Sequence, residues 1–211
     1  MAVLNGRAGR LTAQNGGSRH RGQFPKCARV IGDIRDQSNC GCCWAFGTAA
    51  AASDRLCIAT GGATQVPLSA EDLCFSSNPD GCSGGSPNAA WDYLTSKGVV
   101  SGKQQAFKAG AKGPDPDPFA GAATCADFSL PRCHHHGPVG ADPSPAEGGP
   151  GCPIQKSPAG PIACDPGSAL EYGADKYTFA GAVAMMGRNE TYCPRPPGAV
   201  KRPQRSLAFS C

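Results

Sequence analysis

The residues best suited to chemistry lie in one segment, DQSNCGCCWAF, at positions 36–46. A cysteine attacks as the thiolate rather than the thiol. Cys43 opens an alanine-rich stretch that predicts a helix over residues 43–58, because alanine is the best helix former. The backbone N–H groups and positive dipole end of that helix would face the sulfur and stabilise its anion. The segment therefore predicts a nucleophile at Cys43, and a buried, inert cysteine on a helix is the alternative.

The same segment resembles the signature C-G-[SA]-C-[WY] around the nucleophile of papain-like cysteine peptidases. Cys42 stands where that family usually has serine or alanine. The resemblance implies that the side-chain amide of Gln37, six residues before Cys43, forms an oxyanion hole with the backbone N–H of Cys43. It also implies a histidine that pairs with the thiolate and transfers protons.

Further segments resemble the cathepsin B branch of that family, over roughly residues 24–186 and most strongly up to Gly102. The resemblance implies a cysteine-type peptidase that is a monomer, acts on peptide or protein substrates, and needs no cofactor or metal. The matching segments occur in the family's order: IGDIRDQSNCGCCWAFG, ASDRLCIATGG, LSAEDLC, DGCSGGSPNAAWDYLTSKGVVSG and CADFSLPRCHHH.

Two further groups of residues are implied to bind substrate. Gly84 and Gly85 would line the cleft, where a peptide must approach the backbone closely; the alternative is a simple turn. His135 and His136 match the occluding-loop histidines that bind a substrate's C-terminal carboxylate in the cathepsin B branch, giving dipeptidyl-carboxypeptidase activity. A cationic imidazole pair suits that role and would depend on pH. An adventitious metal site and a solvated loop without a role are the alternatives.

The 13 cysteines favour disulfides, since no paired CxxC motifs have zinc-finger spacing. Disulfides indicate a lysosome-like compartment or secretion. We interpret Cys42 as an extra thiol with an inert side chain; its oxidation with a neighbouring cysteine, which would inhibit the enzyme, is the alternative. Cys74 has no obvious partner. The resemblance implies the pairs Cys27–Cys57, Cys40–Cys82, Cys125–Cys164 and Cys133–Cys152.

Two more helical segments are predicted beyond residues 43–58. One spans residues 87–97, with Ser86 as N-cap, Pro87 at the first helical position and Gly98 at the C-terminal cap. A shorter one begins at Ser69, with acidic residues in its first turn. Residues 171–186 are predicted to contain a strand.

The chain divides into three parts. Residues 1–26 are expected to be a disordered lead-in, residues 27–186 a partial peptidase domain with an occluding-loop-like segment at about 120–165, and residues 187–211 a disordered, unrelated tail. The resemblance implies an α+β, papain-like fold. Its helical left domain would be present and its β-rich right domain mostly missing.

None of the four histidines, His20 and His134 to His136, lies in a GHA-type segment like the one that carries the family's general base. The NSW-type segment with the orienting asparagine is not found either. We therefore expect a C-terminally incomplete chain with little or no activity. The N-terminus shows no signal peptide despite the secretory cysteine pattern, so it too is expected to be incomplete.

Two hypotheses of other classes stay open: a non-catalytic, disulfide-stapled fragment that binds peptides, and a metal-binding protein that uses the triple histidine and nearby cysteines. The net charge of +4 is too small and dispersed to indicate nucleic acid. No apolar stretch is long enough to cross a membrane.

Overall fold

A computed structural model gives the fold, and it describes residues 22–104, 118–131, 154–180, 200–202 and 205–207. Its helices are the short η1 (Pro25–Cys27), α2 (Ala28–Ile31), the long α3 (Cys43–Ala59), α4 (Ala70–Ser77), the short η2 (Gly81–Ser83) and α5 (Pro87–Ser96). Its strands are β1 (Thr178–Phe179), β2 (Val200–Arg202) and β3 (Arg205–Leu207).

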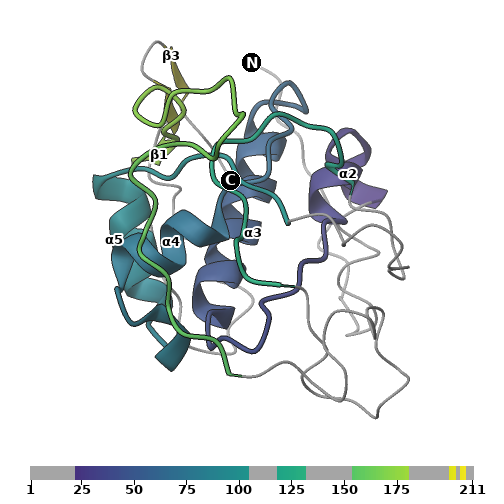
Figure 1. Ribbon diagram of the computed structural model, residues 1–211. Coiled ribbons are helices and arrows are strands. Elements are labelled where there is room, and N and C mark those ends of the chain that lie inside the picture. Colours follow the sequence, from purple (N-terminus) through teal and green to yellow (C-terminus); the bar gives the residue numbers. More distant parts are fainter. Residues whose placement is uncertain (1–21, 105–117, 132–153, 181–199, 203–204, 208–211) are drawn as a thin grey trace, which may run out of the picture.

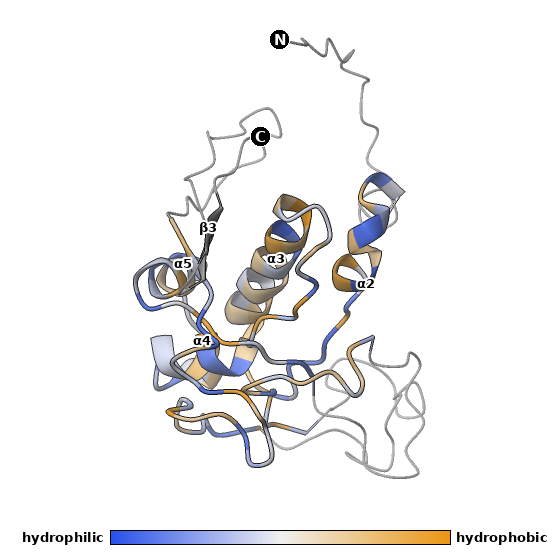
Figure 2. Ribbon diagram, turned by 90° about the horizontal axis from the view of Figure 1, so that it is seen from above, coloured by the Kyte–Doolittle hydropathy of each residue, from blue (hydrophilic) through white to orange (hydrophobic). Residues whose placement is uncertain are grey.

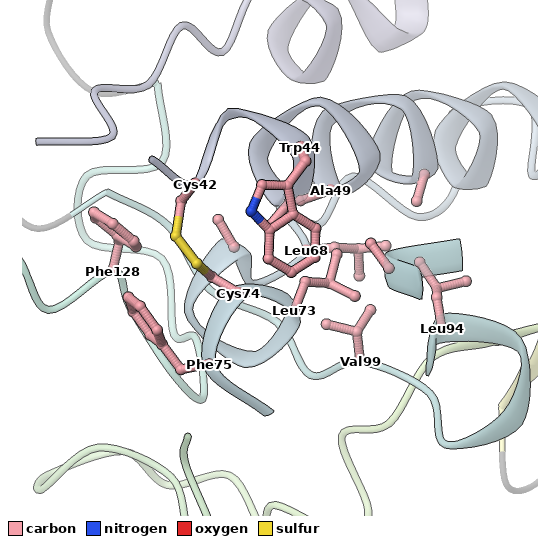
Figure 3. Close-up of a cluster of buried hydrophobic side chains, with 14 of the residues drawn as sticks. Cys42, Trp44, Ala49, Leu68, Leu73, Cys74, Phe75, Leu94, Val99 and Phe128 are labelled. Carbon is pink, nitrogen blue, oxygen red and sulfur yellow. A yellow bond between two sulfur atoms is a disulfide. The ribbon is translucent and has the colours of Figure 1, made fainter. Parts of the chain in front are cut away.

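Helix α3 is the centre of the helical part. In two perpendicular views it lies between α2 on one side and α5 on the other (Figures 1 and 2). Its inward face is made largely of small side chains, among them Ala45, Ala49 and Ala52, all 0% exposed. Small residues let neighbouring helices approach closely, so α4 and α5 both pack on α3. Leu73 of α4 and Leu94 of α5 complete the apolar core (Figure 3).

Local capping signals place the ends of the helices as the sequence predicts. The Ser69 hydroxyl accepts a hydrogen bond from the Asp72 N–H at 3.0 Å, and the Ser86 hydroxyl accepts one from the Asn88 N–H at 3.2 Å. Gly98 follows α5 with a φ of 75°, a conformation that favours glycine. Because these signals act over a few residues, they can be read directly from the sequence.

The described β structure consists of one small antiparallel sheet in the order β1-β2-β3, together with isolated bridges. Thr178 pairs with Lys201 and Phe179 with Val200. Strand β1 lies within residues 171–186, where a strand was predicted. Strands β2 and β3 fall within residues 187–211, the segment that was predicted to be a disordered, unrelated tail. Pairing with β2 covers one edge of β1, an interaction between distant segments that local sequence does not reveal.

The segment of residues 154–180 runs back across the helical part (Figure 1). Its Tyr177 exchanges two backbone hydrogen bonds with Val99, at 2.8 and 3.0 Å. Lys176 reaches the buried Asp72 of α4 at 2.7 Å. The helical unit and the start of the β structure are therefore joined through a polar contact inside the core.

Glu71 of α4 is buried, with 6% exposure, and accepts hydrogen bonds from the backbone N–H and hydroxyl of Ser129 at 3.0 and 2.7 Å. Burial raises the pKa of this carboxyl above its ordinary value, and the bonds from Ser129 only partly oppose that effect. A carboxyl whose pKa is raised by folding stabilises the fold below its unfolded pKa. That contribution is lost as the pH rises through the folded pKa.

Glu71→Gln should therefore remove part of the pH dependence of stability. Between about pH 4 and pH 7 its free energy of unfolding should fall less than that of the wild type. Urea unfolding at a series of pH values measures this, with the exposed Glu171→Gln as the matched control. Identical pH profiles for Glu71→Gln and the wild type would contradict the expectation.

Candidate active site

Cys43 is the first residue of the 17-residue helix α3, and it is exposed. It is the only free cysteine among the nine in the described residues; the other eight form four disulfides. The first N–H groups of a helix have no partner within it, and they carry the positive end of the dipole. A thiolate at this position would lie beside them.

The turn before Cys43 is held by short-range hydrogen bonds. The side-chain amide of Gln37 donates to the Cys40 carbonyl at 2.8 Å. The Asp36 carboxylate accepts from the Ser38 N–H at 2.6 Å, and Ser38 has a positive φ of 60°. The Cys42 N–H also donates to the Cys40 carbonyl, at 2.7 Å. Gln37 is therefore fixed in the same turn that delivers Cys43 to the start of α3.

Two disulfides hold this turn on the helical core. Cys40 bonds Cys82 of η2. Cys42 bonds Cys74 of α4, as Figure 3 shows. The second bond corrects the interpretation of Cys42 as an extra thiol and of Cys74 as unpartnered. Both residues are 0% exposed, and α4 turns Cys74 inward beneath the start of α3. Helix packing, rather than sequence spacing, brings the two together.

The structure also contains Cys27–Cys57 and Cys125–Cys164. With Cys40–Cys82, these are three of the four pairs that the family resemblance implied. The fourth pair, Cys133–Cys152, lies outside the described residues.

Gly84 and Gly85 lie beside the turn that precedes Cys43, which we call the nucleophile turn. The Gly41 N–H donates to the Cys82 carbonyl at 2.8 Å, which joins the turn to the chain just before these glycines. Gly84 has a φ of 107°, which other residues rarely adopt. The backbone of Gly85 packs on the ring of Trp44, and an added Cβ would lie 2.6 Å from the Cζ2 atom of that ring. Trp44 is the residue directly after Cys43, and sequence reasoning assigned its ring no role in the site.

The two histidines of the predicted carboxylate receptor belong to the segment between the described residues 131 and 154. His135 and His136 lie outside the described residues, as do His20 and His134. Within those residues, the group closest to a metal-ligand arrangement is Cys40, Cys42 and Cys82. Their sulfurs are engaged in disulfides, and a disulfide sulfur is not the thiolate that binds metal.

The arrangement defines the class of site: an exposed free cysteine at a helix start, preceded by an anchored glutamine and flanked by a glycine pair. A family model described as "Papain family cysteine protease" matches residues 20–141, which is more than half of the chain and includes Cys43. The chain belongs to the papain family of cysteine proteases.

Relatives of this chain include cathepsin B-like cysteine proteinases. A cathepsin B-like cysteine proteinase of Schistosoma japonicum is 37% identical over 74% of this chain and 40% of its own length. Cathepsin B-like cysteine proteinase 6 of Caenorhabditis elegans is 46% identical over 55% of this chain and 27% of its own length. This chain therefore spans less than half the length of these curated relatives.

Among solved structures, a procathepsin B from Trypanosoma congolense matches with a TM-score of 0.38 and 29% identity. The match covers 59% of this chain and 46% of that one. No helix in the part of the chain that the structure describes combines the length and apolar character needed to span a bilayer.

Proposed function

We propose that this chain forms the side of the active-site cleft that carries the nucleophile in a cathepsin B-like cysteine peptidase. The observation that carries the proposal is the state of Cys43. Eight of the nine described cysteines are in disulfides, whereas Cys43 is free, exposed and first in α3. A fold that pairs every other described cysteine leaves unpaired the one whose position suits a thiolate.

In the proposed reaction the Cys43 thiolate adds to the carbonyl carbon of a peptide bond. The Cys43 N–H and the Gln37 amide would donate to the oxygen that becomes negative. Collapse of the adduct breaks the C–N bond, the amine leaves with a proton from a general acid, and a thioester remains on Cys43. Water then hydrolyses the thioester with the help of a general base.

The glycine pair supports a peptide substrate. A peptide that binds in an extended form uses main-chain hydrogen bonds, and these need a backbone that it can reach. Gly84 and Gly85 have no side chains to block that approach, and Gly85 lies on the ring next to the nucleophile. We propose this pair as the substrate-binding wall, with His135 and His136 as a separate receptor for a C-terminal carboxylate.

The proposed peptidase unit is residues 27–186, after a lead-in of residues 1–26, and it would act as a monomer on protein substrates. Four disulfides in the described residues support a lysosome-like or extracellular location, since such bonds persist in oxidising compartments. None of the four histidines has the flanking sequence of the family's general base. We therefore expect this chain alone to form a covalent adduct at Cys43 but to turn over slowly or not at all.

A peptidyl epoxide tests the proposal, because alkylation needs the thiolate and the cleft but no deacylation. We expect one label per chain, on Cys43, and none in Cys43→Ala. A non-peptidyl epoxide of equal intrinsic reactivity should label about tenfold more slowly, since it gains no positioning from the cleft. Equal rates for the two reagents would contradict a substrate cleft. Peptide binding that is unchanged in Cys43→Ala, without preferential labelling, would favour the non-catalytic binding fragment.

Turnover is measured in parallel with a fluorogenic dipeptide substrate. We expect hydrolysis near the uncatalysed background, whatever the result of the labelling. Robust hydrolysis that the epoxide inhibits and Cys43→Ala abolishes would show that the chain has a working base, and would overturn the expectation of low turnover.

A further inference from the structure

Two disulfides lie directly against each other beneath the nucleophile. The Sγ atoms of Cys40 and Cys42, which belong to different disulfides, are 3.3 Å apart. The sulfurs of Cys40, Cys42 and Cys82 all lie within 4.8 Å of one another. Four sulfurs thus form one cluster, which we call the sulfur cluster: Cys40, Cys42, Cys74 and Cys82.

The sulfur of Cys74 also lies near the Cys40–Cys82 disulfide. A Cβ built on Gly81 would be 2.6 Å from the Cys74 sulfur, so this sulfur packs against the backbone of the residue just before Cys82. The sulfurs of Cys40, Cys42 and Cys82 therefore lie close to one another, and the sulfur of Cys74 lies against the backbone next to Cys82.

Burial differs among the four cysteines of the cluster. Cys42 and Cys74 are 0% exposed and Cys40 is 4% exposed, whereas Cys82 is half-buried. Among the four cysteines, only Cys82 belongs to a residue that is not buried, so we take its sulfur as the entry point for a thiol from solution. Attack on a disulfide requires access to one of its sulfurs, and the other sulfur then leaves as a thiolate.

We propose that the sulfur cluster is a thiol–disulfide exchange site that takes a low-molecular-weight thiol at Cys82. The thiolate of that molecule forms a bond to the Cys82 sulfur, and the Cys40–Cys82 bond breaks to release a Cys40 thiolate. That thiolate, 3.3 Å from the Cys42 sulfur, bonds to it and breaks the Cys42–Cys74 bond. The released Cys74 thiolate attacks Cys82, forms Cys74–Cys82 and expels the original thiol.

The sequence of steps begins and ends with two disulfides and one free thiol. Cys40–Cys82 and Cys42–Cys74 become Cys40–Cys42 and Cys74–Cys82, with no net oxidation or reduction. No oxidant is needed, and the thiol acts as a catalyst.

Exchange would alter the turn before Cys43, because Cys40 and Cys42 both belong to that turn. Cys42 precedes the first residue of α3, and the Cys40 carbonyl accepts the Gln37 amide. A Cys40–Cys42 bond closes a small ring within the turn and detaches Cys42 from α4. This consequence rests on the proposed function, whereas the exchange itself does not.

The exchange is tested by mapping disulfides in the wild-type chain after treatment with reduced glutathione. The reaction is quenched with acid, free thiols are alkylated under denaturing conditions, and linked peptides are identified by mass spectrometry. We expect Cys40–Cys42 and Cys74–Cys82 to accumulate while the Cys27–Cys57 and Cys125–Cys164 links stay intact. Reduction of the four disulfides of the described residues at similar rates, or a mixed disulfide at Cys82 with Cys42–Cys74 unchanged, would overturn the proposal.

A variant isolates the central step without added thiol. Cys74→Ala, in a Cys43→Ser background that removes the nucleophile as an attacking group, leaves Cys42 as a thiol 3.3 Å from Cys40. Its attack should form Cys40–Cys42 and free Cys82. Alkylation should then find about tenfold more label on Cys82 than on Cys42. Label mainly on Cys42, with Cys40–Cys82 retained, would contradict the relay.

Cys57→Ala in the same background is the matched control. It frees Cys27, which belongs to a disulfide outside the sulfur cluster, so the label should stay on Cys27. If Cys74→Ala does not fold, the wild-type mapping still decides the exchange. Because neither readout depends on turnover or on Cys43 labelling, failure here is distinguishable from failure of the proposed function.

Discussion

Replacing Asp72 by alanine is expected to destabilise the chain by about 3–5 kcal/mol, the range for breaking a buried, hydrogen-bonded ion pair. The Asp72 side chain is fully buried in α4. Its carboxylate pairs with Lys176 at 2.7 Å and accepts a hydrogen bond from the Val100 N–H at 3.1 Å. The hydroxyls of Tyr93 and Tyr172 also donate to it, at 3.1 and 2.8 Å.

These contacts explain why the loss should be large. Burial raises the pKa of the Tyr172 hydroxyl and the charge of Asp72 raises it further, so this group stays a donor. Removing Asp72 leaves the Lys176 ammonium, 16% exposed, without its counterion, and leaves two tyrosine hydroxyls and one N–H to find other partners. The segment of residues 172–176 would lose its anchor on α4.

Urea unfolding followed by tryptophan fluorescence measures the effect, with the exposed Asp92→Ala on α5 as the matched control. The control should change stability by no more than about 0.5 kcal/mol. A double-mutant cycle with Lys176→Met separates the ion pair from the hydrogen bonds. A loss below about 1 kcal/mol for Asp72→Ala would show that water or rearrangement replaces the network.

The helices could be predicted from the sequence because their signals are local. Ser69 and Ser86 accept hydrogen bonds from N–H groups two or three residues further on, and Gly98 adopts its positive φ just after α5. The alanine-rich stretch after Cys43 forms a helix of nearly the predicted length. Each of these features depends on a few neighbouring residues.

The contacts that assemble these helices could not be predicted in the same way. Asp72 and Lys176 are separated by 104 positions, and nothing next to either residue marks the other as its partner. The pairing of β1 with β2 likewise joins positions 178 and 201. Such contacts follow from how the helices pack, which is decided by the whole core.

The same difference between local signals and long-range contacts applies to the candidate site. Cys43 and Gln37 lie within one segment, so their types and spacing were enough to predict a nucleophile with an adjoining amide. The Cys42–Cys74 disulfide spans 32 positions and was missed. One signal was present: Cys42 and Cys74 were both left over once the pairs implied by the resemblance were assigned. Cys193 and Cys211 were left over as well, so this signal reduced the possible partners of Cys42 to three cysteines without selecting Cys74.

Gly85→Ala is expected to destabilise the chain by about 1–3 kcal/mol, the usual range for overpacking a close contact. The added Cβ would meet three atoms of the Trp44 ring, including Cζ2 at 2.6 Å and Cδ2 at 2.7 Å. Trp44 is 5% exposed within the core, so its ring has little room to move. Either the ring or the chain at Gly85 must therefore shift.

Either shift would disturb the proposed site. Trp44 directly follows Cys43 in α3, and Gly85 belongs to the proposed substrate-binding wall. We expect slower labelling by the peptidyl epoxide and a changed tryptophan emission spectrum in the folded state. Gly173→Ala is the matched control, because that glycine has no atoms near the added Cβ and no positive φ. It should retain wild-type labelling and change stability by less than about 1 kcal/mol. Wild-type stability and labelling in Gly85→Ala would show that the contact with Trp44 does not hold the substrate-binding wall in place.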